Sequence, residues 1–253
     1  MRRVCFIGDS HLAAVKLGWS AIAAEFSDVE PKFFAAGGTI LSEMAVRDGA
    51  MVCTARKLAR ILQQRTNGLS EIDASYEFYV ICGLELTVAL ALEAWRETGD
   101  GADDEFRRKM SRRIRRTVAF ETLSKLRQIT AAPAFLVPTP FSEDRIPKPL
   151  AHATAPGNAR NIAAEFMKAC RRAARNHEAQ FVGWPIEAMT EDRLAIRAEY
   201  FREPAKLYPA GGPDDAHANA GYGALVAANI LRHMLPEGPV APRGRARLKE
   251  SRG

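Results

Sequence analysis

Short apolar runs alternate along the chain with longer segments in which apolar residues recur at helical spacing. The run at 4–7 and the aromatic, β-branched run at 76–83 are typical of buried strands. Further strands are predicted at 30–38, 132–141 and 180–186. Between the strands, the three- and four-residue spacing predicts helices at 11–26, 42–65, 86–98, 159–177 and 219–235.

One more helix is predicted to begin at Asp103 and to run beyond residue 118. Its apolar face consists of Phe106, Met110, Ile114 and Val118, and arginines occupy its other faces. The segment 107–117 has seven basic residues and no acidic one. Because the apolar face is regular, we interpret the arginines as a solvated surface.

The alternation of strands and helices predicts an α/β fold. We expect a three-layer α/β/α sandwich, in which helices cover both faces of a mainly parallel central sheet. No internal repeat or linker divides the chain, so residues 1–236 are predicted to form a single domain. Residues 237–253 are basic and are predicted to be a flexible tail.

Composition excludes several classes of protein. The chain has 253 residues, of which 47% are hydrophobic and 26% charged, which is ordinary for a globular protein. No apolar run approaches the roughly 18 residues that span a bilayer, and the first apolar run is too short for a signal peptide. We therefore expect a cytoplasmic protein. The four cysteines form no Cys-x-x-Cys pair, so no zinc or redox motif is visible.

Candidate functional residues follow the predicted strands, because ligands bind at the carboxyl ends of parallel strands. The block Gly8, Asp9, Ser10 and His11 follows the first strand. The other candidates follow the second and third strands or precede the last helix: Gly37 and Gly38, Gly83 and Glu85, and Asp214, Asp215 and His217. Taken alone, an Asp-Ser pair before a helix is typical of an N-cap.

A serine, a histidine and an acid are also the parts of a nucleophilic hydroxyl site. The histidine takes the serine proton, and the acid orients the imidazole and stabilises its charged form. Asp214 and His217 are three residues apart and can lie on one turn. Glycines near the nucleophile let backbone N–H groups approach a developing oxyanion. Ser10 can therefore be a helix cap or a nucleophile, and the two interpretations are compatible.

The blocks in this order resemble the SGNH, or GDSL-like, hydrolase family from residue 4 to about residue 235. The resemblance implies a flavodoxin-like sheet and a serine esterase that needs no cofactor or metal. Ser10 would be the nucleophile, His217 the general base and Asp214 its orienting acid. Asp215 has another spacing but is a substitute for that acid.

The same resemblance assigns the surroundings of the reacting carbonyl. The backbone N–H groups of Ser10 and of Gly38, or of Gly37, would donate to the oxyanion. His11 follows the nucleophile directly, and we expect it to be structural or to belong to the pocket wall. Gly83 begins the third block of the family pattern.

The third block departs from the family pattern. Glu85 stands where the family has an asparagine that donates to the oxyanion, and Leu86 replaces the following aspartate. An ionised carboxylate only accepts hydrogen bonds, so it would repel a forming oxyanion. Three alternatives stay open. Glu85 is protonated and donates, it points away while another donor replaces it, or the site binds without efficient turnover.

The predicted function is a serine ester hydrolase that acts on small acyl esters, with carbohydrate O-acetyl groups as one candidate class. An O-acyltransferase is a close variant. The rival is a binding or accessory protein on the same fold, for a saccharide or an anionic ligand, as the net charge of +6 would suit. Nucleic-acid binding is not favoured, because no recognised module or set of interleaved aromatics is present. The sequence predicts no oligomeric state.

Overall fold

A computed structural model describes residues 1–37, 39–98, 103–142, 156–202 and 214–235 of the chain. Its central sheet has five strands in the order β2-β1-β6-β7-β8, and every neighbouring pair is parallel. The strands are β1 (Arg2–Gly8), β2 (Val29–Ala35), β6 (Phe78–Cys82), β7 (Ala134–Val137) and β8 (Ala179–Phe181).

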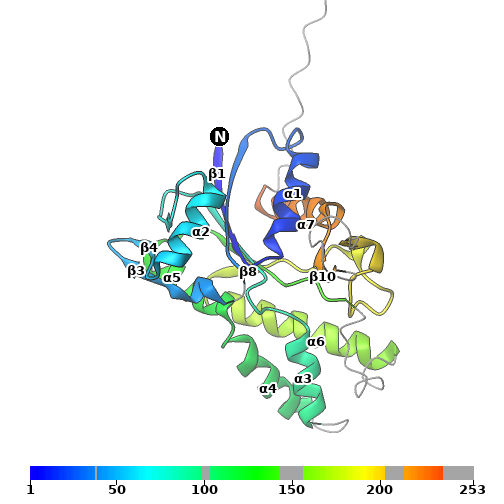
Figure 1. The fold of residues 1–253 in the computed structure, drawn as a ribbon. Helices are drawn as coiled ribbons and strands as arrows, with labels where there is room; N and C mark the ends of the chain where they lie inside the picture. Colours follow the sequence, from blue (N-terminus) through cyan, green and yellow to red (C-terminus); the bar gives the residue numbers. More distant parts are fainter. Residues whose placement is uncertain (38, 99–102, 143–155, 203–213, 236–253) are drawn as a thin grey trace, which may run out of the picture.

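Helices cover both faces of this sheet (Figure 1). Helices α1 (Leu12–Ile22) and α7 (Ala220–Met234) pack against each other on one face. Helices α2 (Arg56–Thr66), α5 (Val118–Ile129) and α6 (Pro156–Arg175) contact the sheet on the other. The predicted three-layer α/β/α sandwich with a mainly parallel sheet is confirmed.

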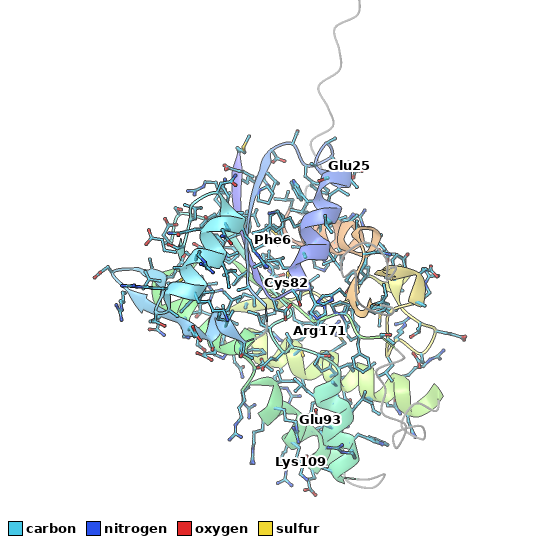
Figure 2. All side chains as sticks on the ribbon, viewed as in Figure 1. Phe6, Glu25, Cys82, Glu93, Lys109 and Arg171 are labelled. Carbon is cyan, nitrogen blue, oxygen red and sulfur yellow. The ribbon has the colours of Figure 1, made fainter. Side chains whose placement is uncertain are left out.

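The central strands are buried on both sides. Val4, Phe6 and Ile7 of β1 are fully buried, and Phe6 stacks on Phe33 of β2 with ring centroids 4.9 Å apart. A continuous apolar run is what a strand covered by helices on both faces requires. Figure 2 shows Phe6 and Cys82 among the central side chains, whereas Glu93 and Lys109 lie at the periphery.

Helices α1 and α7 approach each other closely through glycine. A Cβ atom on Gly223 would lie 1.8 Å from the carbonyl oxygen of Ala14, and one on Gly18 would lie 2.1 Å from the nitrogen of Ala224. No side chain can occupy that space. This contact matters for the site, because α1 begins just after Ser10 and α7 begins just after His217.

The predicted helix over 42–65 is wrong in its first half. The structure has a short 3₁₀ helix, η1 (Ile40–Glu43), and then a hairpin of β3 (Met44–Arg47) and β4 (Ala50–Cys53), which β5 (Glu71–Ile72) extends. Asp48 and Gly49 form the turn with φ values of 49° and 76°. An Asp-Gly pair with two positive φ angles suits the twist of a two-residue hairpin, and this turn overrides the helical spacing.

The predicted long helix from Asp103 is also interrupted. Helix α4 (Asp103–Ile114) ends before Thr117, which is extended with ψ near 153°, and α5 begins at Val118. The Thr117 hydroxyl donates to the Ile114 carbonyl at 2.8 Å and closes the end of α4. Helix α4 pairs with α3 (Ala89–Thr98), and both contact α6 at one end of the molecule (Figure 1).

The segment before the last helix is a strand rather than a turn. β10 (Asp214–Ala218) pairs antiparallel with β9 (Phe201–Arg202), with an irregularity between Asp214 and Ala218. The irregular region ahead of β9 has two 3₁₀ turns, η5 (Ile186–Ala188) and η6 (Ala198–Tyr200). The Asn219 side chain accepts from the Tyr222 amide at 3.0 Å and so caps α7.

Some predictions fall outside the described residues. They concern the loop around residues 99–102, most of the proline-rich loop at 143–155, and the tail at 237–253. The boundary of the single domain at residue 236 also stays a prediction. In the part of the chain that the structure describes, no helix is long and apolar enough to cross a bilayer.

Candidate active site

Ser10 and His217, which are 207 residues apart in the sequence, lie side by side in the structure. The Nε2 atom of His217 is 2.9 Å from the Oγ atom of Ser10, which is hydrogen-bond distance. Ser10 lies in the turn between β1 and α1, and His217 lies in β10 just before α7. Because α1 and α7 pack tightly, the two side chains are held by elements that cannot separate easily.

Asp9, not Ser10, serves the turn at the start of α1. One Asp9 carboxylate oxygen accepts from the His11 amide at 2.9 Å, and the other accepts from the Leu84 amide at 2.8 Å. The N-cap position of α1 is His11, which makes no side-chain capping bond. The side chain of Ser10 is therefore directed to His217 rather than to the helix backbone.

The loop after β6 has an unusual backbone. Gly83, Leu84 and Glu85 all have positive φ angles, of 74°, 52° and 67°. Such a conformation is strained for leucine and glutamate, so the surroundings must hold it. Leu84 is buried, and Asp9 binds its amide. A Cβ atom on Gly83 would lie 2.7 Å from an Asp9 oxygen, so glycine is needed for this approach.

The loop directs Glu85 toward α5. Its carboxylate accepts from the amide of Val118, the first residue of α5, at 3.1 Å. The N-terminus of a helix is a favourable place for a negative charge. In the structure, the Glu85 carboxylate is thus bound at this helix end. The Glu85 side chain is also exposed, and it lines the cavity at Ser10.

A cavity of about 400 Å³ opens at Ser10. It is lined by the predicted residues Ser10, His11 and Glu85 and by Asp9. Three hydroxyl side chains to which the sequence assigned no role complete its polar wall: Thr39, Thr87 and Thr139. Thr39 follows β2, and Thr87 and Thr139 follow β6 and β7, so the rule that ligands bind at the carboxyl ends of strands points to all three.

The structure describes only one of the two glycines predicted beside the oxyanion. Gly37 is exposed just after β2, and a Cβ atom there would meet nothing within 4 Å. Gly38 lies outside the described residues. Among the described groups, none accepts a hydrogen bond from the amide of Ser10 or of Gly37. Within the described ranges, both amides are thus left without an acceptor.

The candidate acids are described only by their backbone. Asp214 and Asp215 belong to β10, three and two residues before His217. Their side chains lie outside the part that the structure describes. The expectation that Asp214 and His217 share one turn is wrong, because the segment is extended and paired with β9.

His11 lies against the other histidine. Its ring centroid is 5.3 Å from that of His217, at an interplanar angle of 32°. It also lines the cavity at Ser10, as expected for a wall residue. No set of three or more His, Cys, Asp or Glu side chains in the described ranges is arranged to hold a metal ion.

Cys82 is close to the site, but its environment suppresses thiolate formation. Burial raises the pKa of its thiol well above the usual value, and the nearby charge of Asp9 raises it further. Burial also raises the pKa of Tyr222 in α7, with a smaller contribution from Cys82. A thiol or phenol that stays protonated is a poor nucleophile. The Ser10 hydroxyl, in contrast, has the imidazole of His217 within hydrogen-bond distance.

Comparison with known proteins gives structural likenesses only. No family model and no curated protein matches the chain. A carbohydrate acetylesterase family member from Sinorhizobium meliloti is similar over 93% of this chain and 100% of its own, with 14% identity and a TM-score of 0.43. An extracellular lipase from Streptomyces rimosus is similar over 91% and 99%, with 13% identity and a TM-score of 0.47.

A third solved structure is an acetyl-xylooligosaccharide esterase from Geobacillus, in a mutant form. The likeness covers 96% of this chain and 97% of that one, with 14% identity and a TM-score of 0.40. The function proposed below rests on the contacts of Ser10 and His217 themselves.

Proposed function

We propose that the protein is a serine ester hydrolase in which Ser10 is the nucleophile and His217 the general base. The observation that carries this proposal is the 2.9 Å distance between Ser10 Oγ and His217 Nε2. A nucleophile and a base within hydrogen-bond reach, at the carboxyl end of a parallel sheet, are the core of an acyl-transfer site. Small acyl esters, with carbohydrate O-acetyl groups among them, are the substrates that the family resemblance favours.

The reaction proceeds in two steps. The Ser10 hydroxyl donates its proton to Nε2 of His217 and its oxygen attacks the ester carbonyl. The bond between the carbonyl carbon and the alcohol oxygen then breaks, and His217 passes the proton to the leaving alcohol. Water attacks the acyl-serine, His217 takes a proton from that water, and Ser10 regains a proton as the acid leaves.

The oxyanion formed in each step needs donors. The Ser10 and Gly37 amides have no described acceptor, and the Thr39 and Thr87 hydroxyls line the same cavity. We assign the first oxyanion contact to the Ser10 amide and the second to the amides of 37 or 38. Thr87 lies two residues after Glu85, and its hydroxyl replaces the donor that the family pattern would supply there.

The base also needs an orienting acid. Asp214 keeps this role in the proposal, with Asp215 as the alternative. An Asp→Asn change at the orienting position preserves shape but favours the wrong imidazole tautomer. We expect Asp214→Asn to lower kcat about 10²–10⁴-fold and Asp215→Asn to leave it nearly unchanged. The reverse pattern would assign the role to Asp215.

Ester hydrolysis by purified variants tests the proposal. The wild-type protein should hydrolyse 4-nitrophenyl acetate, and His217→Ala should lower kcat about 10²–10⁴-fold. Ser10→Ala should abolish the saturable activity. Ser20→Ala, on the exposed side of α1, is the matched control and should retain full activity. Equal rates in Ser10→Ala and wild type would overturn the proposal.

A binding protein on this fold is the second candidate. It is favoured by the Glu85 carboxylate on the wall of the Ser10 cavity, where the resemblance calls for a donor. A protein of this kind would bind an acylated saccharide or an anionic ligand without Ser10-dependent turnover.

An O-acyltransferase would instead release less free acid when an acceptor alcohol is added, because the acyl group moves to that alcohol.

A further inference from the structure

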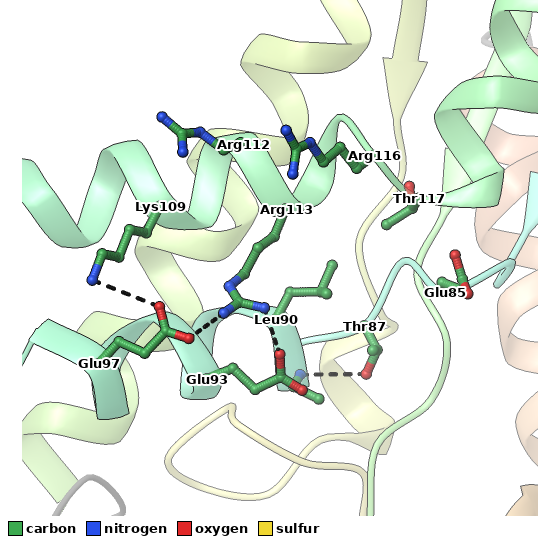
Figure 3. A pocket seen from close by; sticks show the side chains of 11 residues that line it. Glu85, Thr87, Leu90, Glu93, Glu97, Lys109, Arg112, Arg113, Arg116 and Thr117 are labelled. Atoms are coloured by element: carbon green, nitrogen blue, oxygen red, sulfur yellow. Dashed lines mark hydrogen bonds and ion pairs between the residues drawn. The ribbon is translucent and has the colours of Figure 1, made fainter.

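A second cavity adjoins the one at Ser10. Its volume is about 650 Å³, and it lies beside α3 and α4 (Figure 3). The two cavities share a wall made of Glu85, Thr87 and Ala89. Because a small acyl group fills only part of the cavity at Ser10, a substrate bound there has room to extend into the second one.

Two of the cations in this second cavity are already neutralised. Arg113 contacts Glu93 at 2.8 Å and also binds Glu97, and Lys109 lies 3.6 Å from Glu97. Figure 3 shows both side chains turned toward the carboxylates of α3. These ion pairs fix the two helices to each other and leave little charge for a ligand.

Arg112 and Arg116 are different. Arg112 lies in the last turn of α4, and Arg116 lies in the turn that follows this helix. Both line the cavity, both are exposed, and both extend away from the α3 carboxylates in Figure 3. No carboxylate among the described residues pairs with either guanidinium. Two neighbouring guanidiniums without an acid can bind a carboxylate, sulfate or phosphate through charge-assisted hydrogen bonds.

The shared wall offsets only part of this positive charge. Glu85 is the remaining carboxylate of the cavity, and its charge faces the amide of Val118 at the start of α5. With Glu93 and Glu97 paired, the cavity has four cations against three carboxylates. The cavity therefore keeps one excess positive charge, and its two cations without an ion pair to a described carboxylate are Arg112 and Arg116.

We propose that Arg112 and Arg116 select esters that carry a carboxylate, sulfate or phosphate on one of their two halves. This inference rests on the proposed function of Ser10, because it places the anionic group in the cavity next to the nucleophile. The helix interpreted from sequence as a solvated arginine face thus contributes to substrate specificity.

The test uses two matched ester pairs. In 4-acetoxybenzoate and its methyl ester, the charge is on the alcohol half. In 4-nitrophenyl hydrogen glutarate and its methyl ester, it is on the acyl half. We expect kcat/KM for the anionic member to exceed that of the neutral member about tenfold or more in one pair, which also shows which half enters the cavity. This preference should shrink as salt is added.

The double variant Arg112→Ala/Arg116→Ala should bring that ratio close to one. Arg115→Ala removes a neighbouring exposed arginine that lines neither cavity, and it should keep the wild-type ratio. Melting temperatures of both variants check that the fold is retained. A ratio of one or less in both pairs, or a preference that survives the double variant, would overturn the inference.

Binding separates this inference from the proposed function. The four esters are titrated calorimetrically into Ser10→Ala protein, with and without the two arginine substitutions. Tighter binding of an anionic ester that depends on Arg112 and Arg116, together with no turnover by the wild type, would support the cationic cavity while contradicting the hydrolase. Equal binding of the anionic and neutral esters would contradict the cationic cavity whether or not Ser10 reacts.

Discussion

Asp9 and Ser10 are neighbours in the chain, yet they serve different parts of the structure. Asp9 accepts the amides of His11 and Leu84 and so joins the turn after β1 to the loop after β6. Ser10 is left to face His217. Because one residue supports the backbone, the next can present its hydroxyl without also capping the helix.

Substitutions of Glu85 separate its structural effect from its charge. Glu85→Gln keeps an acceptor for the Val118 amide, so the free energy of unfolding should change by less than about 0.5 kcal/mol. Glu85→Ala removes that acceptor from an exposed site and should cost about 1 kcal/mol. Thermal denaturation of the three proteins measures both differences.

The same two variants test whether the charge of Glu85 opposes the oxyanion that forms during ester hydrolysis. Loss of the carboxylate from the wall of the Ser10 cavity should raise kcat for 4-nitrophenyl acetate severalfold in Glu85→Gln, because a nearby negative charge opposes the developing one. A large fall in kcat at unchanged stability would instead mean that Glu85 has a positive catalytic role.

Helices α1 and α7 set the distance between the two reacting side chains. Ser10 precedes one helix and His217 precedes the other, and Gly18 and Gly223 allow the helices to touch. A methyl group on Gly223 would have to push the helices apart. Displacement of about 1 Å between catalytic groups can cost about a hundredfold in rate.

Gly223→Ala should therefore lower stability and activity together. We expect a loss of about 1–3 kcal/mol from overpacking and a fall in kcat of about tenfold or more. Denaturant unfolding and ester hydrolysis, both with Ser20→Ala as the α1 control, measure the two effects. A variant as stable and active as the wild type would show that the close approach of α1 and α7 does not position the site.

The four cysteines test the packing of the molecule as a whole. Cys5, Cys82 and Cys170 are buried, and burial raises the pKa of each thiol. Cys53 is half-buried in β4, and burial raises its pKa less strongly. Protonated, inaccessible thiols react slowly with thiol reagents.

In the native protein, a disulfide reagent should therefore modify one thiol at most within minutes, and all four after unfolding. Prior treatment with iodoacetamide should leave ester hydrolysis unchanged, because Ser10 is the nucleophile. Rapid modification of three or four thiols in the native protein, or loss of activity on alkylation, would contradict this description of the core and the site.

The fold class could be predicted because its signals are local, whereas the pairing of residues 10 and 217 was predicted only from the family resemblance. Buried strands are continuous apolar runs, and polar residues directly after them identify the edge where ligands bind. The hairpin at 44–53 was missed because its apolar residues also match helical spacing. Its decisive signal was the pair Asp48-Gly49, which favours a two-residue turn.

The break between α4 and α5 could not be predicted from periodicity. Ile114 and Val118 keep the four-residue spacing across it, so the apolar face continues through the break. The group that binds the start of α5 is Glu85, which is 33 residues away in the sequence. The direction of the Glu85 side chain depends on three successive positive φ angles held by Asp9, and that contact exists only in the folded chain.

The most direct test of the account is covalent labelling of Ser10 by a fluorophosphonate. Only a serine activated by a base should displace the fluoride, so intact-protein mass spectrometry of the wild type should show one adduct, with peptide analysis placing it on Ser10. His217→Ala should label far more slowly, and Ser10→Ala should not label at all. A wild-type protein without an adduct, or an adduct that persists in Ser10→Ala, would contradict the central claim.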